Sequence, residues 1–181
     1  MANGGLIGPV KVVCTPSTKV TSFTSSGTFN KKNCTSTIPE VLVVAGGGAG
    51  GSSRYGGGGG GAGGYRTAAC VSIPNSGIAI TVGGGGSVAT SPASVPACTR
   101  NGSNSVICGI LTSAGGGGGA VESTTAAINT GADGGSGGGG SSYTTGNPRP
   151  GGSGNTPPSS PSQGNNGGAG AGQCGQTRNG G

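Results

Sequence analysis

The feature that most constrains this chain is its set of long glycine runs. Residues 46–51, 56–64 and 134–140 are glycine apart from single alanine or serine interruptions, and unbroken runs occupy 83–86 and 115–119. Glycine costs about 1 kcal/mol per helical position relative to alanine, which excludes long α-helices. With 48 glycines, 11 prolines and 29% hydrophobic residues among 181, the chain also lacks the large side chains of a conventional core. The backbone itself must therefore supply most of the contacts that hold the fold together.

A continuous glycine run has three structural options. It can be a flexible linker, or collagen, but collagen needs glycine at every third position with proline at the others. It can also form polyglycine II, with polyproline-II geometry and a rise of about 3.1 Å per residue, whose backbone groups bond to neighbouring helices. An ordered chain with so few side chains favours packed polyglycine II. The alanine and serine interruptions are then expected on an outer face.

Short apolar segments predict β-strands. Residues 10–14 and 41–44 are strand-like, and the continuous apolar run of the second indicates a strand buried on both faces. Residues 19–24 and 28–29 alternate around a Ser-Ser-Gly turn, which predicts a hairpin.

The predicted fold class is therefore all-β with a non-regular glycine-rich region and no significant helix. Residues 1–45 form a small N-terminal β module for attachment or assembly, with Phe23, Phe29 and nearby aliphatic residues as its core. Residues 46–181 form a body of packed polyglycine-II helices and short strands with exposed loops. Strand, glycine run and loop recur in this body at a spacing of roughly 30 residues, which is a loose internal repeat.

The cysteines are candidates for cross-links. The chain has no histidine and no CxxC pair, so no zinc site is expected. Cys98 and Cys108 flank the turn dipeptide Asn101-Gly102, which suggests a stapled hairpin, and Cys14 with Cys34 is a second possible pair. Free buried thiols are the alternative. The disulfide candidates are Cys14, Cys34, Cys70, Cys98, Cys108 and Cys174.

The sequence contains no catalytic constellation. Without histidine, the Ser-His-Asp and Cys-His arrangements are not available, and three acidic residues leave almost no paired-carboxylate chemistry. Residues 46–51 fit the dinucleotide pattern G-x-G-x-x-G, but no helical pattern and no acidic residue follow at the required distance. We expect no enzyme activity, no cofactor and no metal.

Charge and hydropathy restrict the location and partners. The net charge is +6, and the basic residues are scattered along the chain. This disfavours specific nucleic-acid binding and fits attraction to an anionic surface such as a cell envelope. No apolar run is long enough to enter a membrane as a spanning helix. The N-terminal residues lack the pattern of a signal peptide, so we expect synthesis in a host cytoplasm. Disulfides are typical of proteins that function outside the cell. A virus particle combines synthesis in the cytoplasm with function outside the cell.

Tyrosine and arginine stand out in the segments beside the glycine runs. Both residue types are favoured at interfaces, and loops of glycine, serine and tyrosine resemble the composition of binding loops. The alternative is that these side chains pack over the glycine bundle and bond its carbonyls. The candidate receptor contacts are Arg54, Tyr55, Tyr65, Arg66, Tyr143 and Arg149.

The chain resembles the glycine-rich virion proteins of tailed bacteriophages. The resemblance rests on residues 40–48 and 56–66, with supporting patterns at 22–29 and 80–83. The chain is also similar to the tail-fibre tip adhesins of T-even-type phages, in which a polyglycine-II sandwich displays host-recognising loops at its end. It departs from those adhesins in its cysteines and its N-terminal β segment.

The resemblance implies a tail-fibre or tail-tip adhesin of the virion. Its partners would be other virion proteins, further copies of the chain with a trimer favoured, and a host surface glycan or outer-membrane protein. The loops around residues 54–55 and 147–150 would face the receptor. A capsid decoration or cement protein, or an extracellular filament subunit with a purely structural role, is the alternative function.

Overall fold

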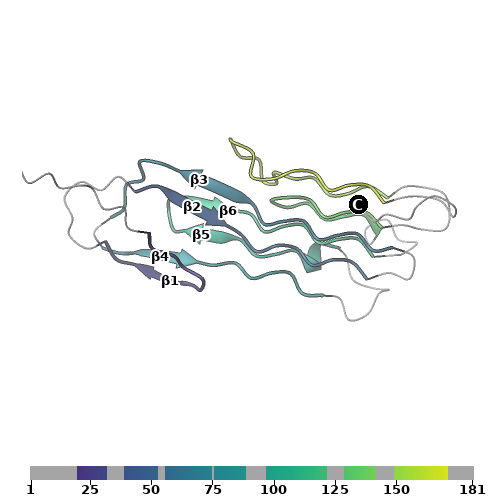
Figure 1. Ribbon diagram of the computed structural model, residues 1–181, viewed down its shortest axis with the longest axis horizontal. Helices are drawn as coiled ribbons and strands as arrows, with labels where there is room; N and C mark the ends of the chain where they lie inside the picture. The colour runs from purple at the N-terminus through teal and green to yellow at the C-terminus, as the bar shows by residue number, and fades with distance from the viewer. Residues whose placement is uncertain are drawn as a thin grey trace, which may run out of the picture.

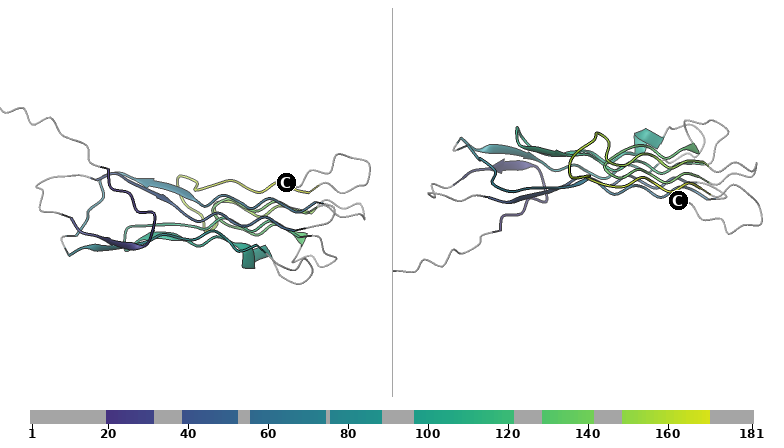
Figure 2. Two further views of the ribbon diagram at one scale, coloured as in Figure 1. Left: turned by 60° about the horizontal axis from the view of Figure 1, so that its bottom comes forward. Right: turned by 90° about the horizontal axis from the view of Figure 1, so that it is seen from above.

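The molecule is elongated, with its strands at one end and glycine-rich segments running side by side away from them (Figure 1). The computed structural model describes residues 20–31, 39–52, 56–74, 76–88, 97–121, 129–141 and 149–170. Among these residues the one helical element is the 3-10 turn Ala97–Arg100. Two further views show the same division into a β end and a long bundle (Figure 2). The predicted all-β class with a non-regular glycine-rich region is confirmed.

Two antiparallel sheets form the β end. The larger sheet has the strand order β1-β4-β5-β6, with strands β1 (Gly27–Phe29), β4 (Ile78–Thr81), β5 (Ser105–Ile107) and β6 (Leu111–Ser113). The smaller sheet pairs β2 (Val41–Val44) with β3 (Tyr65–Ala68). Because β2 contacts β5 and β6, and β3 contacts β6, the smaller sheet packs on the β5–β6 half of the larger one.

The side-chain core at this end is small. Val43, Ile78 and Leu111 are buried. The rings of Phe23 and Phe29 are half-buried and meet edge to face, with centroids 6.3 Å apart. Of the residues expected in the core, Phe23, Phe29 and Val43 therefore contribute to it, together with Ile78 and Leu111 from later in the chain.

Strand β2 is not buried on both faces, contrary to the sequence expectation. Leu42 is 56% exposed and Val44 is 52% exposed, whereas Val43 between them is buried. Successive side chains of a strand point to opposite faces, and only one face of this sheet is covered. An apolar run in the sequence does not show whether another element packs on the second face of the strand.

The predicted hairpin of residues 19–24 with 28–29 is also wrong. β1 pairs with β4, with Gly27 opposite Ile80, and the described residues 20–26 form no strand. Alternation of apolar and polar residues indicates a strand but does not show which strand pairs with it. Here β4 supplies a better-matched apolar edge. Residues 10–14 lie outside the described residues. Strands before and after the predicted boundary at residue 45 share both sheets.

The glycine-rich part consists of extended segments that bond to one another through their backbones. We number them along the chain as segments 1 (45–51), 2 (56–64), 3 (83–88), 4 (100–104), 5 (114–121), 6 (129–134), 7 (135–141), 8 (149–154) and 9 (163–170). Between segments 1 and 2, every third N–H donates: those of Ala45, Gly48 and Gly51 bond the carbonyls of Gly64, Gly61 and Gly58 at 2.8–3.1 Å. A repeat of three residues is the period of polyglycine II, so the predicted packing is confirmed.

Segment 5 is the centre of this bundle, and every residue in it is buried. Its N–H groups divide into three faces because three residues complete one turn. Gly116 and Gly119 donate to segment 1, and Gly117 and Ala120 donate to segment 7. Carbonyls of the same segment accept from segments 2, 4, 6 and 7. One glycine-rich stretch is thus bonded to neighbours on all sides.

The third face of segment 5 is satisfied by side-chain amides. Gly118 N–H donates to Asn101 Oδ1 at 2.7 Å, and Gly115 N–H donates to Asn104 Oδ1 at 2.8 Å. Both asparagines lie in segment 4, three residues apart, so the threefold period brings both amides to one neighbour. The expected turn at Asn101-Gly102 is therefore wrong. The turn in this part of the chain is Cys108–Gly109–Ile110, where Gly109 has φ +71°.

The three interruptions of the glycine runs differ in their surroundings. Ala62 is exposed, Ser136 is half-buried and Ala49 is buried. The expectation of an outer face is therefore wrong for Ala49. A methyl or hydroxymethyl group fits where two segments do not approach most closely, and burying it removes apolar surface from water.

Close backbone approach explains why glycine is needed in the interior of the bundle. A Cβ atom added to Gly117 would lie 1.9 Å from the carbonyl oxygen of Ala132. At the exposed Gly84, an added Cβ would meet nothing within 4 Å. The requirement for glycine is thus a property of contacts between segments and differs from one position to the next.

We expect Gly117→Ala to destabilise the protein by about 3 kcal/mol or more, because the methyl group forces segments 5 and 6 apart and breaks backbone hydrogen bonds. The matched variant Gly84→Ala is expected to be neutral or stabilising by up to about 1 kcal/mol, since it only restricts the unfolded chain. Urea unfolding of both variants measures the difference. Equal stability of the two variants would contradict the packing described here.

Asn101→Ala is expected to lower the free energy of unfolding by about 1–3 kcal/mol, because it leaves the buried N–H of Gly118 without an acceptor. Asn101→Asp keeps an oxygen at the same place and should lose clearly less. Unfolding curves and amide hydrogen exchange at Gly118 test this pair. We expect faster amide hydrogen exchange at Gly118 in Asn101→Ala and not in Asn101→Asp.

Candidate binding surfaces

The bundle has a distal end, opposite the strands, where the segments terminate together. Four pairs of successive described ranges end and begin here. The residues at these ends are Ser52 and Gly56, Val88 and Ala97, Val121 and Asn129, and Ser141 and Arg149. Backbone bonds link the segments close to these points, from Gly51 to Gly58, Ala49 to Arg100, Ser141 to Asn129 and Gly170 to Arg149. The chain therefore leaves and re-enters the bundle repeatedly at one end.

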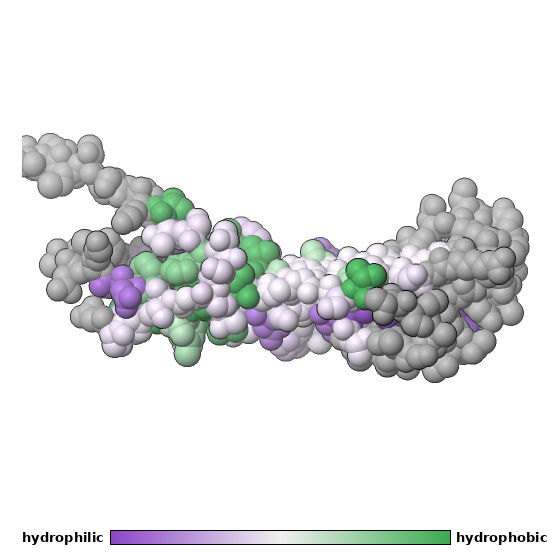
Figure 3. Space-filling model, turned by 90° about the horizontal axis from the view of Figure 1, so that it is seen from below, coloured by the Kyte–Doolittle hydropathy of each residue, from purple (hydrophilic) through white to green (hydrophobic). Residues whose placement is uncertain are grey.

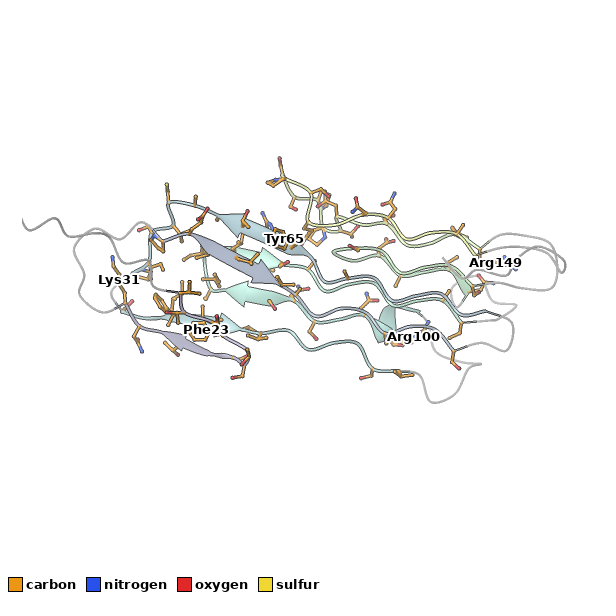
Figure 4. The ribbon with its side chains drawn as sticks, viewed as in Figure 1. Phe23, Lys31, Tyr65, Arg100 and Arg149 are labelled. Carbon is orange, nitrogen blue, oxygen red and sulfur yellow. The ribbon has the colours of Figure 1, made fainter. Side chains whose placement is uncertain are left out.

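Arg100 is built into the bundle near this end (Figure 4). Its side chain is 1% exposed, and its Nε and Nη2 both donate to the carbonyl of Gly119, the first at 3.1 Å. A buried polar group is tolerated when it is hydrogen-bonded. The guanidinium thus holds segment 4 against segment 5. Nothing in the sequence around Arg100 distinguished it from the other basic residues.

Arg149 is the candidate contact that the structure describes at the distal end (Figure 4). Arg149 is half-buried, and its guanidinium Nε is buried and has no hydrogen bond to the described residues. The candidates Arg54, Tyr55 and Tyr143 lie outside the described residues. The described neighbours on both sides of these positions lie at this end.

Tyr65 and Arg66 lie elsewhere, in β3 at the junction between the sheets and the bundle (Figure 4). Tyr65 is 57% exposed, and Arg66 is half-buried with Nη1 donating to the carbonyl of Thr112 at 3.0 Å. A groove of about 220 Å³ is lined by Tyr65, Arg66, Thr67, Pro161 and Ser162. The structure thus separates the candidate contacts into a distal group and a junction group.

Hydrophobic surface gathers over the β end, whereas the glycine bundle is pale along most of its length (Figure 3). Leu42 and Val44 of β2 are among the exposed large hydrophobic residues at this end. On the β2–β3 sheet they lie across from Thr67 and Tyr65 in the strand register. The β end and the glycine bundle therefore present different surfaces.

The cysteines do not form the suggested staple. Cys70 and Cys108 have exposed free thiols, so no Cys98–Cys108 bond is present. Cys14, Cys34 and Cys174 lie outside the described residues, as does the side chain of Cys98. Cys70 and Cys108 are both beside strands, at the β end of the molecule.

The described residues contain neither a metal-binding cluster nor a membrane-spanning helix. No group of three or more His, Cys, Asp or Glu side chains that could hold a metal ion occurs among them. In that same part of the chain, no helix has the length and apolar character needed to cross a membrane.

Comparison with known proteins identifies the family. A family model for a glycine-rich domain matches residues 24–181. The chain belongs to this glycine-rich domain family. The matched region includes both sheets and all the polyglycine-II segments, so this glycine-rich domain comprises the β end as well as the bundle. No match is found among curated proteins or among solved structures.

Iodoacetamide is expected to modify Cys70 and Cys108 in the native glycine-rich domain, because exposed thiols are accessible to the reagent. Peptide mass spectrometry without reduction identifies the modified residues and any disulfide-linked peptides. The same labelling in denaturant is the control for all thiols. Protection of either residue until the protein unfolds would contradict its exposed position.

Proposed function

We propose that this glycine-rich domain is a structural protein of a bacteriophage particle, and specifically a tail-fibre or tail-tip adhesin that binds the host cell surface. The observation that carries the proposal is the antiparallel return of polyglycine-II segments to one end of a long bundle. The described ends of the segments are thereby held together by backbone hydrogen bonds.

The scaffold suits recognition by several weak contacts. The close contacts of segment 5 with its neighbours fix the segments relative to one another, so loops at the distal end need not order the body when they bind. Arg149, a half-buried residue at this end, is one proposed contact. Arg54, Tyr55 and Tyr143 are the further proposed contacts.

Several copies would act together in the particle. Each chain binds a host surface glycan or an outer-membrane protein weakly, and avidity among copies gives stable attachment. A trimer is the proposed assembly, and other virion proteins are the proposed partners at the β end. The exposed Leu42 and Val44 supply apolar surface for those contacts. The protein would work outside the cell, without catalysis and without inserting into a membrane.

A purely structural role is the second candidate, either as a capsid decoration or cement protein or as a filament subunit. The exposed thiols of Cys70 and Cys108 favour it, because they can cross-link neighbouring chains. In that case the bundle would pack against other subunits, and no receptor would be required.

The first test combines immunogold labelling with inhibition of adsorption. Antibody to the chain should label the distal tail or fibres, and the purified protein should reduce adsorption of particles to host cells. A variant with Arg54, Tyr55, Tyr143 and Arg149 all changed to Ala should require at least tenfold more protein for the same effect. The matched control is Gly84→Ala, on the side of the bundle, which should inhibit like the unchanged protein.

Label over the head at high copy number would overturn the adhesin and favour the decoration protein. Label on free filaments with none on particles would overturn the assignment to a phage. Equal inhibition by the fourfold variant and the unchanged protein would place the receptor contacts away from the distal end.

A further inference from the structure

The groove at the junction of sheet and bundle is a second candidate binding site, separate from the distal end. One wall comes from the start of β3, with Tyr65, Arg66 and Thr67, and the other from Pro161 and Ser162. The two walls are tied together by the backbone, since Tyr65 N–H donates to the carbonyl of Gln163 at 2.9 Å. The groove is therefore part of the folded structure.

The second wall is held in place by a local hydrogen-bond network. Asn155 Oδ1 accepts from the N–H of Ser159 at 3.0 Å, from its hydroxyl at 2.9 Å and from Gln163 N–H at 3.2 Å. Gln163 is buried, and its Oε1 accepts from Ala114 N–H at 2.9 Å. This wall is therefore anchored directly to the central segment of the bundle, which preorganises the groove.

The side chains that line the groove form a polar and aromatic set. Tyr65 contributes a ring that is 57% exposed, and Thr67 and Ser162 are exposed residues with hydroxyl groups. The Ser162 hydroxyl donates to the carbonyl of Gly164 at 2.7 Å, so its oxygen is left to accept. Arg66 projects to the other face of β3 from Tyr65 and Thr67, uses one N–H to bond Thr112, and has no bond from its other guanidinium donors to the described residues. Aromatic rings pack against the apolar face of a ring-shaped ligand, hydroxyls bond its polar edge, and arginine pairs with carboxylates.

The size of the groove limits the ligand to one ring. Its volume of about 220 Å³ is below the 300–1,000 Å³ typical of sites for drug-sized ligands. The chain carries a net charge of +6, which attracts anionic polymers. A carboxylated sugar matches the size, the aromatic wall and the arginine together.

We propose that this groove binds one hexuronic acid unit of an acidic polysaccharide. The pyranose ring lies against Tyr65 and over the free edge of β3, where its carboxylate pairs with Arg66 from the other face of that strand. Its hydroxyl groups bond Thr67 and donate to Ser162 Oγ. The inference rests on the proposed function, for which it supplies a glycan class and a second contact point on the side of the bundle. Along an extended polysaccharide, this site and the distal end can engage one host surface together.

Titration of the purified protein with D-glucuronate, followed by NMR, tests the proposal. For a ligand of this size we expect a Kd on the order of 1 mM, and at least tenfold weaker binding of the neutral D-glucose. Tyr65→Ala should weaken glucuronate binding at least tenfold. The control is Val20→Ala, an exposed residue of the β end that does not line the groove, and it should bind like the unchanged protein.

Arg66→Ala should remove the preference for glucuronate over glucose while leaving glucose binding unchanged, a result that a merely structural role would not produce. Ser162→Phe fills the groove from its exposed rim and should abolish binding of both sugars, which gives a second test if Tyr65→Ala does not fold. Equal binding of the two sugars, or unchanged binding by folded Tyr65→Ala and Ser162→Phe, would overturn the proposal.

The two proposals fail separately. If particles show distal label and purified protein inhibits adsorption, but glucuronate does not bind, the adhesin stands and the groove proposal is wrong. If glucuronate binds through Tyr65 and Arg66 but the label lies over the head, the groove stands as a glycan site and the adhesin is wrong.

Discussion

The backbone hydrogen bond between neighbouring polyglycine-II segments is the interaction on which this structure depends. In most small domains helices bond internally or strands bond to their neighbours in a sheet, and side chains fill the space between these elements. Here the glycine segments have no internal bonds and few side chains lie between them, so a buried N–H must find a partner outside its own segment. The contacts of Gly117 show the consequence: its N–H bonds Ser136, its carbonyl accepts from Gly61, and its Cα faces the carbonyl of Ala132 too closely for a side chain.

The bundle and the sheets stabilise the fold through different interactions. Ordering glycine has a large entropic cost, and a single polyglycine pair could not offset it. The sheets bury Val43, Ile78 and Leu111, and their strands continue directly into segments of the bundle. Side-chain amides then complete the lattice where no backbone carbonyl is in reach, as Asn101, Asn104 and Gln163 do around segment 5. A few polar side chains therefore stabilise a core made almost entirely of main chain.

This construction also determines where recognition can take place. The sides of the bundle carry small residues, and interior positions such as Gly48 and Gly117 tolerate no side chain at all. The side chains proposed for binding lie at the β end, at the junction with its Tyr65 and Arg66, and at the segment ends near Arg149. Proposals about binding therefore concern these three places, and the rest of the molecule acts as a spacer and support.

The sequence by itself determined the class of structure, because runs of glycine without long side chains leave only a backbone lattice, and it identified the apolar segment at 41–44. It did not determine the strand partners, since the pairing of β1 with β4 joins residues far apart in the chain. It also misassigned Asn101-Gly102 as a turn and placed Ala49 on the outside of the bundle, because both positions depend on which segment lies next to them. Of the candidate contacts, tertiary structure placed Tyr65 and Arg66 in a groove with Pro161 and Ser162, and Arg149 at the distal end. A glycine run specifies that it must pack against backbone, but only the assembled bundle decides which backbone that is.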